Sequence, residues 1–297
     1  MEKSKLSLTH FDDVEVISAA ACNQQPIGAC STAEGDVTVA SGDNAHAEGY
    51  GTTASGFAAH SEGVNTVAGG DRSHAEGSET QASGLVSHAE GSGTNASGTA
   101  SHAEGILTTS VGLYSHTEGA NTSSIGVAAH AEGNSSIAYG TASHAEGSNT
   151  SAGNPQDPGQ GIGAHSEGLS TQAVGSGAHA EGALTIAFGD NAHAEGSLTI
   201  AKGLASHAEG SNTQAFGTSS HAEGQGTTAS GLGSHAEGTT TRAFGPAAHA
   251  EGFATIASGD SSHAEGTAAV ASGDASHAEG FVTQALGDQS HAEGSNT

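Results

Sequence analysis

The sequence predicts an all-β protein, a parallel β-solenoid with coils of 14 residues. The main observation is the spacing of the histidines, which recur every 14 residues from His46 to His291 with a single step of 21 between His144 and His165. The second observation is that each repeat reads S-H-A-E-G-x-x-T-x-A-x-G-x-x, two stretches of period-two alternation that each end at a glycine. A strict short period of this kind is typical of solenoids, in which each unit is stable only when stacked on its neighbours.

Composition alone favours the opposite conclusion. The chain of 297 residues has 47 glycines, 3% aromatic residues, no tryptophan and a formal net charge of −27, a profile typical of chains that cannot bury enough apolar surface to fold. The repeat overrides this profile, because stacking coils bury small side chains between strands without needing a thick apolar core.

The period divides the chain into two parts. Residues 1–30 are expected to form an N-terminal connector arm, and residues 31–297 a solenoid of 19 coils whose first copy, STAEG, carries Thr32 in place of histidine. The extra seven residues around NPQDPGQ, near 154–160, are expected to form a loop that leaves the solenoid at a corner. Within the arm, residues 6–17 alternate like a strand.

Each coil is expected to hold two strands joined by two corners. Positions 1 and 3 of the repeat are small, position 5 is always glycine, position 8 is threonine in 17 of 19 copies and position 10 is usually alanine. These residues suit the narrow space between two strands, so we predict a thin interior of alanine, serine, threonine and glycine. Corner glycines supply the unusual backbone angles of a sharp bend.

The two outer faces differ in how much they vary. Positions 9 and 11 change freely from coil to coil, as expected of a solvent-facing surface. Positions 2 and 4 are histidine in 18 and glutamate in all 19 copies, although a free surface should vary as positions 9 and 11 do. We therefore predict that the His/Glu face is covered, and that another copy of the chain covers it.

The repeat resembles the head domains of trimeric autotransporter adhesins, the YadA-like left-handed parallel β-roll, whose 14-residue repeat is close to S-V-A-I-G-x-x-x-x-A-x-G. The SHAEG runs are also similar to those of Gram-positive and phage surface proteins. The resemblance implies a left-handed homotrimer whose strands line a threefold axis, here with histidine and glutamate in place of valine and isoleucine. The residues expected to form this ladder at the trimer axis are His74, Glu76, His88, Glu90, His102, Glu104, His193, Glu195, His207, Glu209, His263 and Glu265.

Charge pairing would make such an axis tolerable. Protonating the 18 repeat histidines would change the net charge from −27 to −9 per chain, and buried charges need partners. Paired imidazoles are expected to have pKa values above the ordinary value of about 6.5.

Other functions of the ladder stay open. Histidine and glutamate two apart on a strand are plausible metal ligands, with His46, Glu48, His60 and Glu62 as weak candidates, although structural packing is favoured for a motif repeated so often. We expect no enzymatic activity and no cofactor, since no single copy stands out as an active site. Ice binding by the threonine column is excluded, because turning the threonines outward would force Phe188, Lys202 and Arg242 into the interior.

The expected function is that of a structural subunit of an extracellular fibre or appendage. The alternative is an adhesin or receptor-binding module that uses the variable face, where Ile186, Phe188, Phe216 and Phe244 could contact a host-surface ligand or a neighbouring fibre. The acidic charge argues against nucleic acid, and no apolar run is long enough for a classical signal peptide or a membrane span. An extracellular, cell, spore or virion surface location is expected.

The chain is also expected to stack head-to-tail into filaments. Its last copy, SHAEGSNT, ends halfway through a coil, so residues 6–17 of the next trimer could complete it. Cys22 and Cys30 would lie near this junction and could cross-link it, although two reduced thiols are the simpler alternative.

Overall fold

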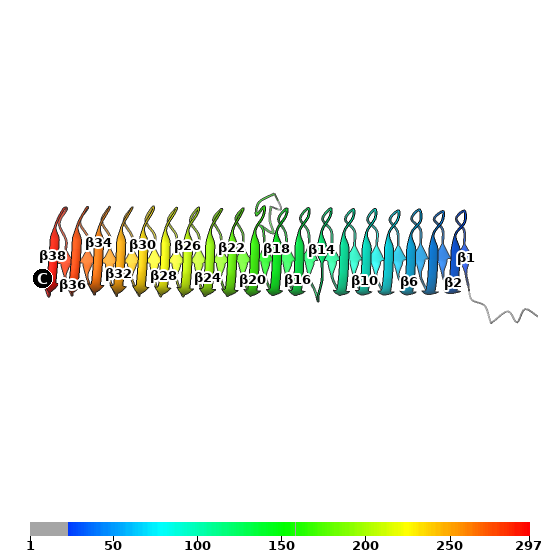
Figure 1. The fold of residues 1–297 in the computed structure, drawn as a ribbon, viewed down its shortest axis with the longest axis horizontal. Coiled ribbons are helices and arrows are strands. Elements are labelled where there is room, and N and C mark those ends of the chain that lie inside the picture. The colour runs from blue at the N-terminus through cyan, green and yellow to red at the C-terminus, as the bar shows by residue number, and fades with distance from the viewer. Residues whose placement is uncertain (1–22, 158) are drawn as a thin grey trace, which may run out of the picture.

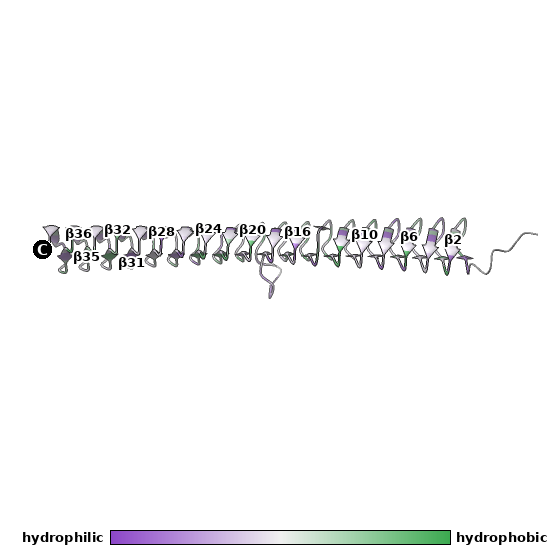
Figure 2. Ribbon diagram, turned by 90° about the horizontal axis from the view of Figure 1, so that it is seen from below, coloured by the Kyte–Doolittle hydropathy of each residue, from purple (hydrophilic) through white to green (hydrophobic). Residues whose placement is uncertain are grey.

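The computed structural model describes residues 23–157 and 159–297. In this part of the chain all regular structure is β, in coils that stack into a straight rod with the chain advancing by one coil at a time (Figure 1). Viewed from the side, the strands form two rows (Figure 2). The predicted parallel β-solenoid is confirmed.

One sheet, here named the His/Glu sheet, contains the even-numbered strands, most of five residues. They are β2 (Thr32–Asp36), β4 (His46–Tyr50), β6 (His60–Val64), β8 (His74–Ser78), β10 (His88–Ser92), β12 (His102–Ile106), β14 (His116–Thr117), β16 (His130–Asn134), β18 (His144–Ser148), β20 (His165–Leu169), β22 (His179–Ala183), β24 (His193–Ser197), β26 (His207–Ser211), β28 (His221–Gln225), β30 (His235–Thr239), β32 (His249–Phe253), β34 (His263–Thr267), β36 (His277–Phe281) and β38 (His291–Ser295).

The other sheet, named the variable sheet, contains the odd-numbered strands, each of two residues. They are β1 (Gln25–Pro26), β3 (Val39–Ala40), β5 (Thr53–Ala54), β7 (Val67–Ala68), β9 (Gln81–Ala82), β11 (Asn95–Ala96), β13 (Thr109–Ser110), β15 (Ser123–Ser124), β17 (Ile137–Ala138), β19 (Ser151–Ala152), β21 (Gln172–Ala173), β23 (Ile186–Ala187), β25 (Ile200–Ala201), β27 (Gln214–Ala215), β29 (Thr228–Ala229), β31 (Arg242–Ala243), β33 (Ile256–Ala257), β35 (Val270–Ala271) and β37 (Gln284–Ala285).

Both sheets are parallel and keep one register throughout. Each strand pairs with the equivalent strand of the next coil, so that His88 lies opposite His102 and Glu90 opposite Glu104. The register continues across the 21-residue step, where His144 lies opposite His165. At the usual strand separation, nineteen coils make a rod about 90 Å long.

The interior is a thin layer of small side chains, as predicted for four of the five positions. Ala45, Ala47, Thr52 and Ala54 are at most 1% exposed, and the equivalent residues of the coils between the first and the last are similarly buried. Position 5 differs from the prediction. Gly49 and its equivalents lie outside this layer, and its φ of 109° is a conformation that residues with a Cβ rarely adopt.

Position 12 of the repeat requires glycine for a different physical reason. Gly56 is buried at the corner, and a Cβ added there would collide with the carbonyl oxygen of Gly70 in the next coil. Stacked corners therefore approach too closely for any side chain.

Two details concern the expected boundaries. β1 pairs with β3, so Gln25 and Pro26 extend the variable sheet into the segment that we assigned to the arm. The loop near 154–160 leaves the rod beside β18 and β20 (Figures 1 and 2), where Gly161 takes the place of the corner glycine that stacks on Gly140.

Candidate functional site: the His/Glu sheet

Alternation along the long strands places histidine and glutamate on one outward face. In β8, Ala75 is fully buried while His74 and Glu76 on either side of it are partly exposed. Parallel pairing in constant register then stacks like on like, so that the face carries one row of imidazoles and one row of carboxylates.

The imidazole rings form a continuous column. Neighbouring rings from His46 to His291 have centroids 4.7–4.9 Å apart, and their planes lie within 12° of parallel except between His263 and His277, where the angle is 32°. This spacing is set by the strand separation of the sheet.

The carboxylates lie beside the outer nitrogen of each ring. In His102 the Nε2 atom is 3.5 Å from Glu90 Oε1, and in His165 it is 3.5 Å from Glu167 Oε2. The other pairs are separated by up to 4.0 Å, and all are longer than a normal hydrogen bond. From His46 to His277, Nε2 is buried and has no hydrogen-bond partner in the described chain, although about a third of each side chain is exposed.

The glutamates adopt two settings along the rod. His88 and His102 lie closest to the glutamate of the preceding coil, whereas His130 and most of the histidines after it, such as His207, lie closest to the glutamate of their own coil. His60 lies 4.0 Å from both Glu48 and Glu62. His46 likewise lies 4.0 Å from both Glu34 and Glu48, so that in these two coils the Nε2 atom lies between two carboxylates.

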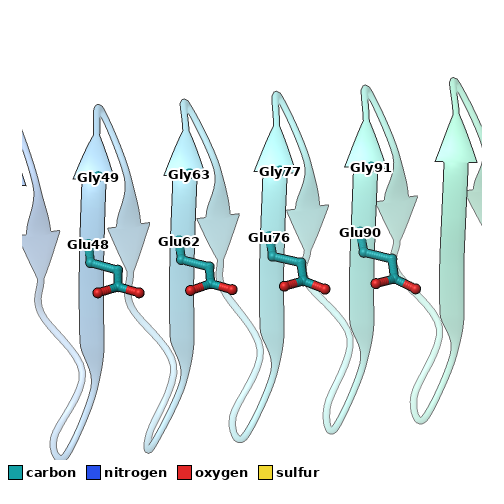
Figure 3. Close-up of a pocket in the computed structure, with 8 residues that line it drawn as sticks. All are labelled: Glu48, Gly49, Glu62, Gly63, Glu76, Gly77, Glu90 and Gly91. Atoms are coloured by element: carbon teal, nitrogen blue, oxygen red, sulfur yellow. The ribbon is translucent and has the colours of Figure 1, made fainter.

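The glutamate row lines a shallow groove whose floor is the column of position-5 glycines. Figure 3 shows four of these side chains extending in parallel, one from each strand, and the groove there is lined by Glu48, Gly49, Glu62, Gly63, Glu76, Gly77, Glu90 and Gly91. Since glycine has no side chain, the carboxylates stand clear along this edge of the sheet.

Burial and the stacking of like residues change the pKa of some residues in each row. Burial, followed by the charge of neighbouring imidazoles, lowers the pKa of His60, His74, His88, His102, His130 and His207. The expectation that pairing raises the histidine pKa is therefore wrong for these six. The reason is that burial disfavours the charged ring and each ring stacks on two other imidazoles, while the neighbouring carboxylates raise the pKa by less.

Three of the carboxylates have a shifted pKa because of the glutamates in neighbouring coils. Hydrogen bonding to Glu48 and Glu76 raises the pKa of Glu62 to about 7, and hydrogen bonding to Glu118 raises that of Glu132 to about 7. Hydrogen bonds with Glu90 and Glu62 lower the pKa of Glu76. The pKa values of Glu62 and Glu76 move in opposite directions because the two carboxyls are neighbours, so that a proton on one favours the charged form of the other.

The predicted ladder residues all lie on this face, in two separate rows. Their role at a trimer axis stays a prediction, as does the role of His46, Glu48, His60 and Glu62 in metal binding. Sequence analysis missed the contact between glutamates of successive coils. The signal was present, because a strict repeat in a parallel sheet necessarily stacks equal residues.

The residues predicted for outer-face binding lie on the variable sheet. Phe188, Phe216 and Phe244 are 54%, 39% and 45% exposed, and Ile186 is partly buried. Cys30 is exposed, while Cys22 and residues 6–17 lie outside the described residues. Within the described chain no helix is long and apolar enough to cross a membrane.

Comparison with protein families identifies this repeat. The family model for the YadA head domain repeat matches residues 33–59, 47–73, 118–143, 166–192, 180–201 and 208–234. Together with the 14-residue coils, these matches confirm the predicted resemblance to a YadA-like head. A comparison with curated proteins finds no match.

Proposed function

We propose that this chain of YadA-head-type repeats is a structural subunit of an extracellular fibre or appendage, and that its rods associate as homotrimers through the His/Glu sheet. The observation that carries the proposal is the row of Nε2 atoms from His46 to His277 that are buried yet lack a hydrogen-bond partner. Buried polar groups without partners are costly, and a second surface that supplies acceptors would remove that cost.

The two sheets differ in how much their sequences vary, and this difference also points to the His/Glu sheet as the contact face. Position 9 on the variable sheet accommodates Gln214, Thr228 and Arg242 in successive coils, while position 2 on the His/Glu sheet is histidine throughout these coils. A surface that faces only solvent does not require such uniformity.

Light scattering of the purified chain in neutral buffer tests this proposal. We expect a mass of three chains, and a stable monomer would contradict it. The paired substitutions His193→Lys and His207→Lys should weaken association by adding bulk and charge to the contact face. The matched control places lysine on the variable sheet, as Gln214→Lys and Thr228→Lys, and should leave the mass unchanged.

Head-to-tail stacking through the N-terminal arm is the finer part of the proposal. It is supported by the strand-like alternation of residues 6–17, which lie outside the described residues. Because β1 pairs with β3, the informative deletion removes residues 1–22 and keeps β1. Electron micrographs should then show rods of single length in place of filaments, and unchanged filaments would contradict a role for the arm.

An adhesin that binds a ligand through the variable sheet is the second candidate. It is supported by the exposed Phe188, Phe216 and Phe244, which recur in every second coil. A screen against host cells and glycans should give binding that is lost when all three are replaced by serine. The control replaces three exposed apolar residues at position 6, Leu169, Phe253 and Phe281, with serine.

A further inference from the structure

We propose that the His/Glu sheet is a one-dimensional array of binding sites for a borderline divalent transition-metal ion such as Zn²⁺, Co²⁺ or Ni²⁺. Each site would consist of one histidine Nε2 and the carboxylates of the two glutamates that flank it along the rod. This inference does not depend on the proposed trimer, because one chain supplies all three of these ligands.

The separation of nitrogen and oxygen fits a bridging ion better than a hydrogen bond. Bonds from Zn²⁺ to imidazole nitrogen and carboxylate oxygen are about 2.0–2.2 Å, so the two ligand atoms lie about 3.4 Å apart at the tetrahedral angle and at most about 4.2 Å apart when the ion lies on the line between them. The Nε2 to oxygen distances of 3.5 Å at His102, 3.7 Å at His88 and 4.0 Å at His60 lie inside this limit. They lie outside the range of a hydrogen bond.

The stacking of the rings decides which ligands can share an ion. Parallel rings whose centroids lie 4.8 Å apart, such as His74 and His88, place their Nε2 atoms about that far from each other. This exceeds the span of about 4.2 Å, so one ion cannot bind both rings. The ligand set is therefore one histidine with carboxylates, and His60 between Glu48 and Glu62 shows how both carboxylates are placed.

The donor atoms select the class of metal. Imidazole suits Zn²⁺, Ni²⁺ and Cu²⁺, whereas Mg²⁺ and Ca²⁺ prefer sites made only of oxygen ligands. The remaining coordination positions are open to water or to carboxylates of another copy.

Charge limits the number of ions. Adjacent sites lie about 4.8 Å apart, and each coil supplies one carboxylate, so one divalent ion in every coil would accumulate positive charge along the rod. One ion for every two glutamates is neutral. With 18 repeat histidines, occupancy of every second coil gives about nine ions per chain.

The test uses the full-length chain without a polyhistidine tag, saturated with Zn²⁺ and then separated from free metal by gel filtration. Mass spectrometry of the metal content should give about nine ions per chain. The same preparation with Co²⁺ should show a visible d–d absorption band of Co²⁺ bound by imidazole and carboxylate. Retention of less than one ion per chain would overturn the proposal.

Two variants of equal charge distinguish binding at the proposed sites from binding by histidines alone and from unspecific attraction of metal ions to an acidic protein. The test variant replaces six consecutive ladder carboxylates, E195Q, E209Q, E223Q, E237Q, E251Q and E265Q. The control removes six corner carboxylates from position 13, D43N, D71N, D190N, D260N, D274N and D288N. Both keep every histidine.

We expect the ladder variant to retain about one third fewer ions and the corner control to retain as many as the unmodified chain. Equal retention by the ladder variant would show that histidines bind alone, and an equal loss in the control would show unspecific attraction. Either result overturns the proposal. If circular dichroism shows that the six-fold ladder variant does not fold, E195Q/E223Q/E251Q replaces it, with D190N/D260N/D274N as control and a proportionally smaller expected loss.

Discussion

Val86 adopts a left-handed backbone conformation, with φ of 59°, and its replacement by asparagine should stabilise the rod. A β-branched residue is a poor choice for this conformation, whereas asparagine tolerates it. The position recurs as the last residue of each repeat, and Asn44 and Asn191 occupy it in other coils with φ of 58° and 54°. Val86→Asn therefore places in one coil a residue that the same backbone already accepts in others.

The magnitude follows from two opposing effects. The left-handed conformation costs an ordinary L-residue about 1–2 kcal/mol, and most of this is recovered with asparagine. Val86 is 49% exposed, so the lost burial of its side chain costs only about 0.5 kcal/mol. The amide of residue 86 donates to the carbonyl of Asp71 at 2.9 Å in either case. We expect a net gain of about 1 kcal/mol in the free energy of unfolding.

The reverse substitution is the matched control. Asn191 has the same backbone conformation, and its amide donates to the carbonyl of Ser176 at 2.8 Å. Asn191→Val should destabilise the rod by a similar amount. Val37 and Val282 have φ of 57° and 54° and lie in distant coils, so asparagine at all three valine positions should give nearly additive gains.

Denaturant unfolding followed by circular dichroism measures the effect, and hydrogen exchange places it in the coils around Val86, because solenoids unfold partly by local steps. In a chain of this length 1 kcal/mol corresponds to a rise in melting temperature of about 2 °C. A loss of stability in Val86→Asn, or the same sign of change in both variants, would refute the reasoning that backbone strain dominates here.

Three further perturbations test the interior, the corners and the ladder. Ala75→Ser should be tolerated and should stabilise the rod by up to about 1 kcal/mol, because the new hydroxyl can bond Thr80 Oγ1, which is buried without a partner. Ser61 and Thr66 form this hydrogen bond at 2.7 Å in the preceding coil. A melting curve checks this, and a fall in melting temperature would contradict it. Gly84→Ala should destabilise by about 2 kcal/mol or more, since its Cβ would meet the carbonyl oxygen of the next corner, and unfolding curves should show no comparable loss for an alanine at the exposed neighbouring position 11. Acidification should lower the melting temperature, because the six histidines with lowered pKa contribute stability that is complete above the unfolded value of about 6.5 and is lost as pH falls through it and then through the folded values. The raised pKa of Glu62 and Glu132, about 7, acts in the opposite direction between pH 4.5 and 7, so the loss should be partial in this window; stability that declines only on the alkaline side would favour charged pairs.

The repeat itself determined most of the fold. A period of 14 with small residues at alternate positions leaves room for two strands and two corners, and Ala47, Thr52 and Ala54 are buried as that pattern predicts. The sequence likewise determined that histidine and glutamate share one outward face, since side chains two apart on a strand point to the same side.

Other features depend on what each coil meets in the next one. Sequence reasoning placed the glycine of position 5 in the interior. In the structure Gly49 lies outside it and is needed because its backbone has φ of 109°. Asp71 Oδ1 accepts a hydrogen bond from the amide of Phe57 in the preceding coil at 3.0 Å, and no pattern within one repeat indicates this contact because its two partners are 14 residues apart.

The pKa values of the ladder residues show most clearly what the sequence determines and what only the tertiary structure decides. The sequence supplies one imidazole and one carboxylate per coil, a composition that suggests pairs of opposite charge. The tertiary structure stacks imidazole on imidazole and carboxylate beside carboxylate at the strand spacing, as at His74 and His88 with centroids 4.8 Å apart. Desolvation by burial, followed by repulsion from the neighbouring imidazole, then lowers the pKa of His74. A parallel sheet in constant register stacks each ring on its own copies, and the nearest carboxylate oxygen, 3.8 Å from His74 Nε2, is too far for a hydrogen bond that would offset this effect.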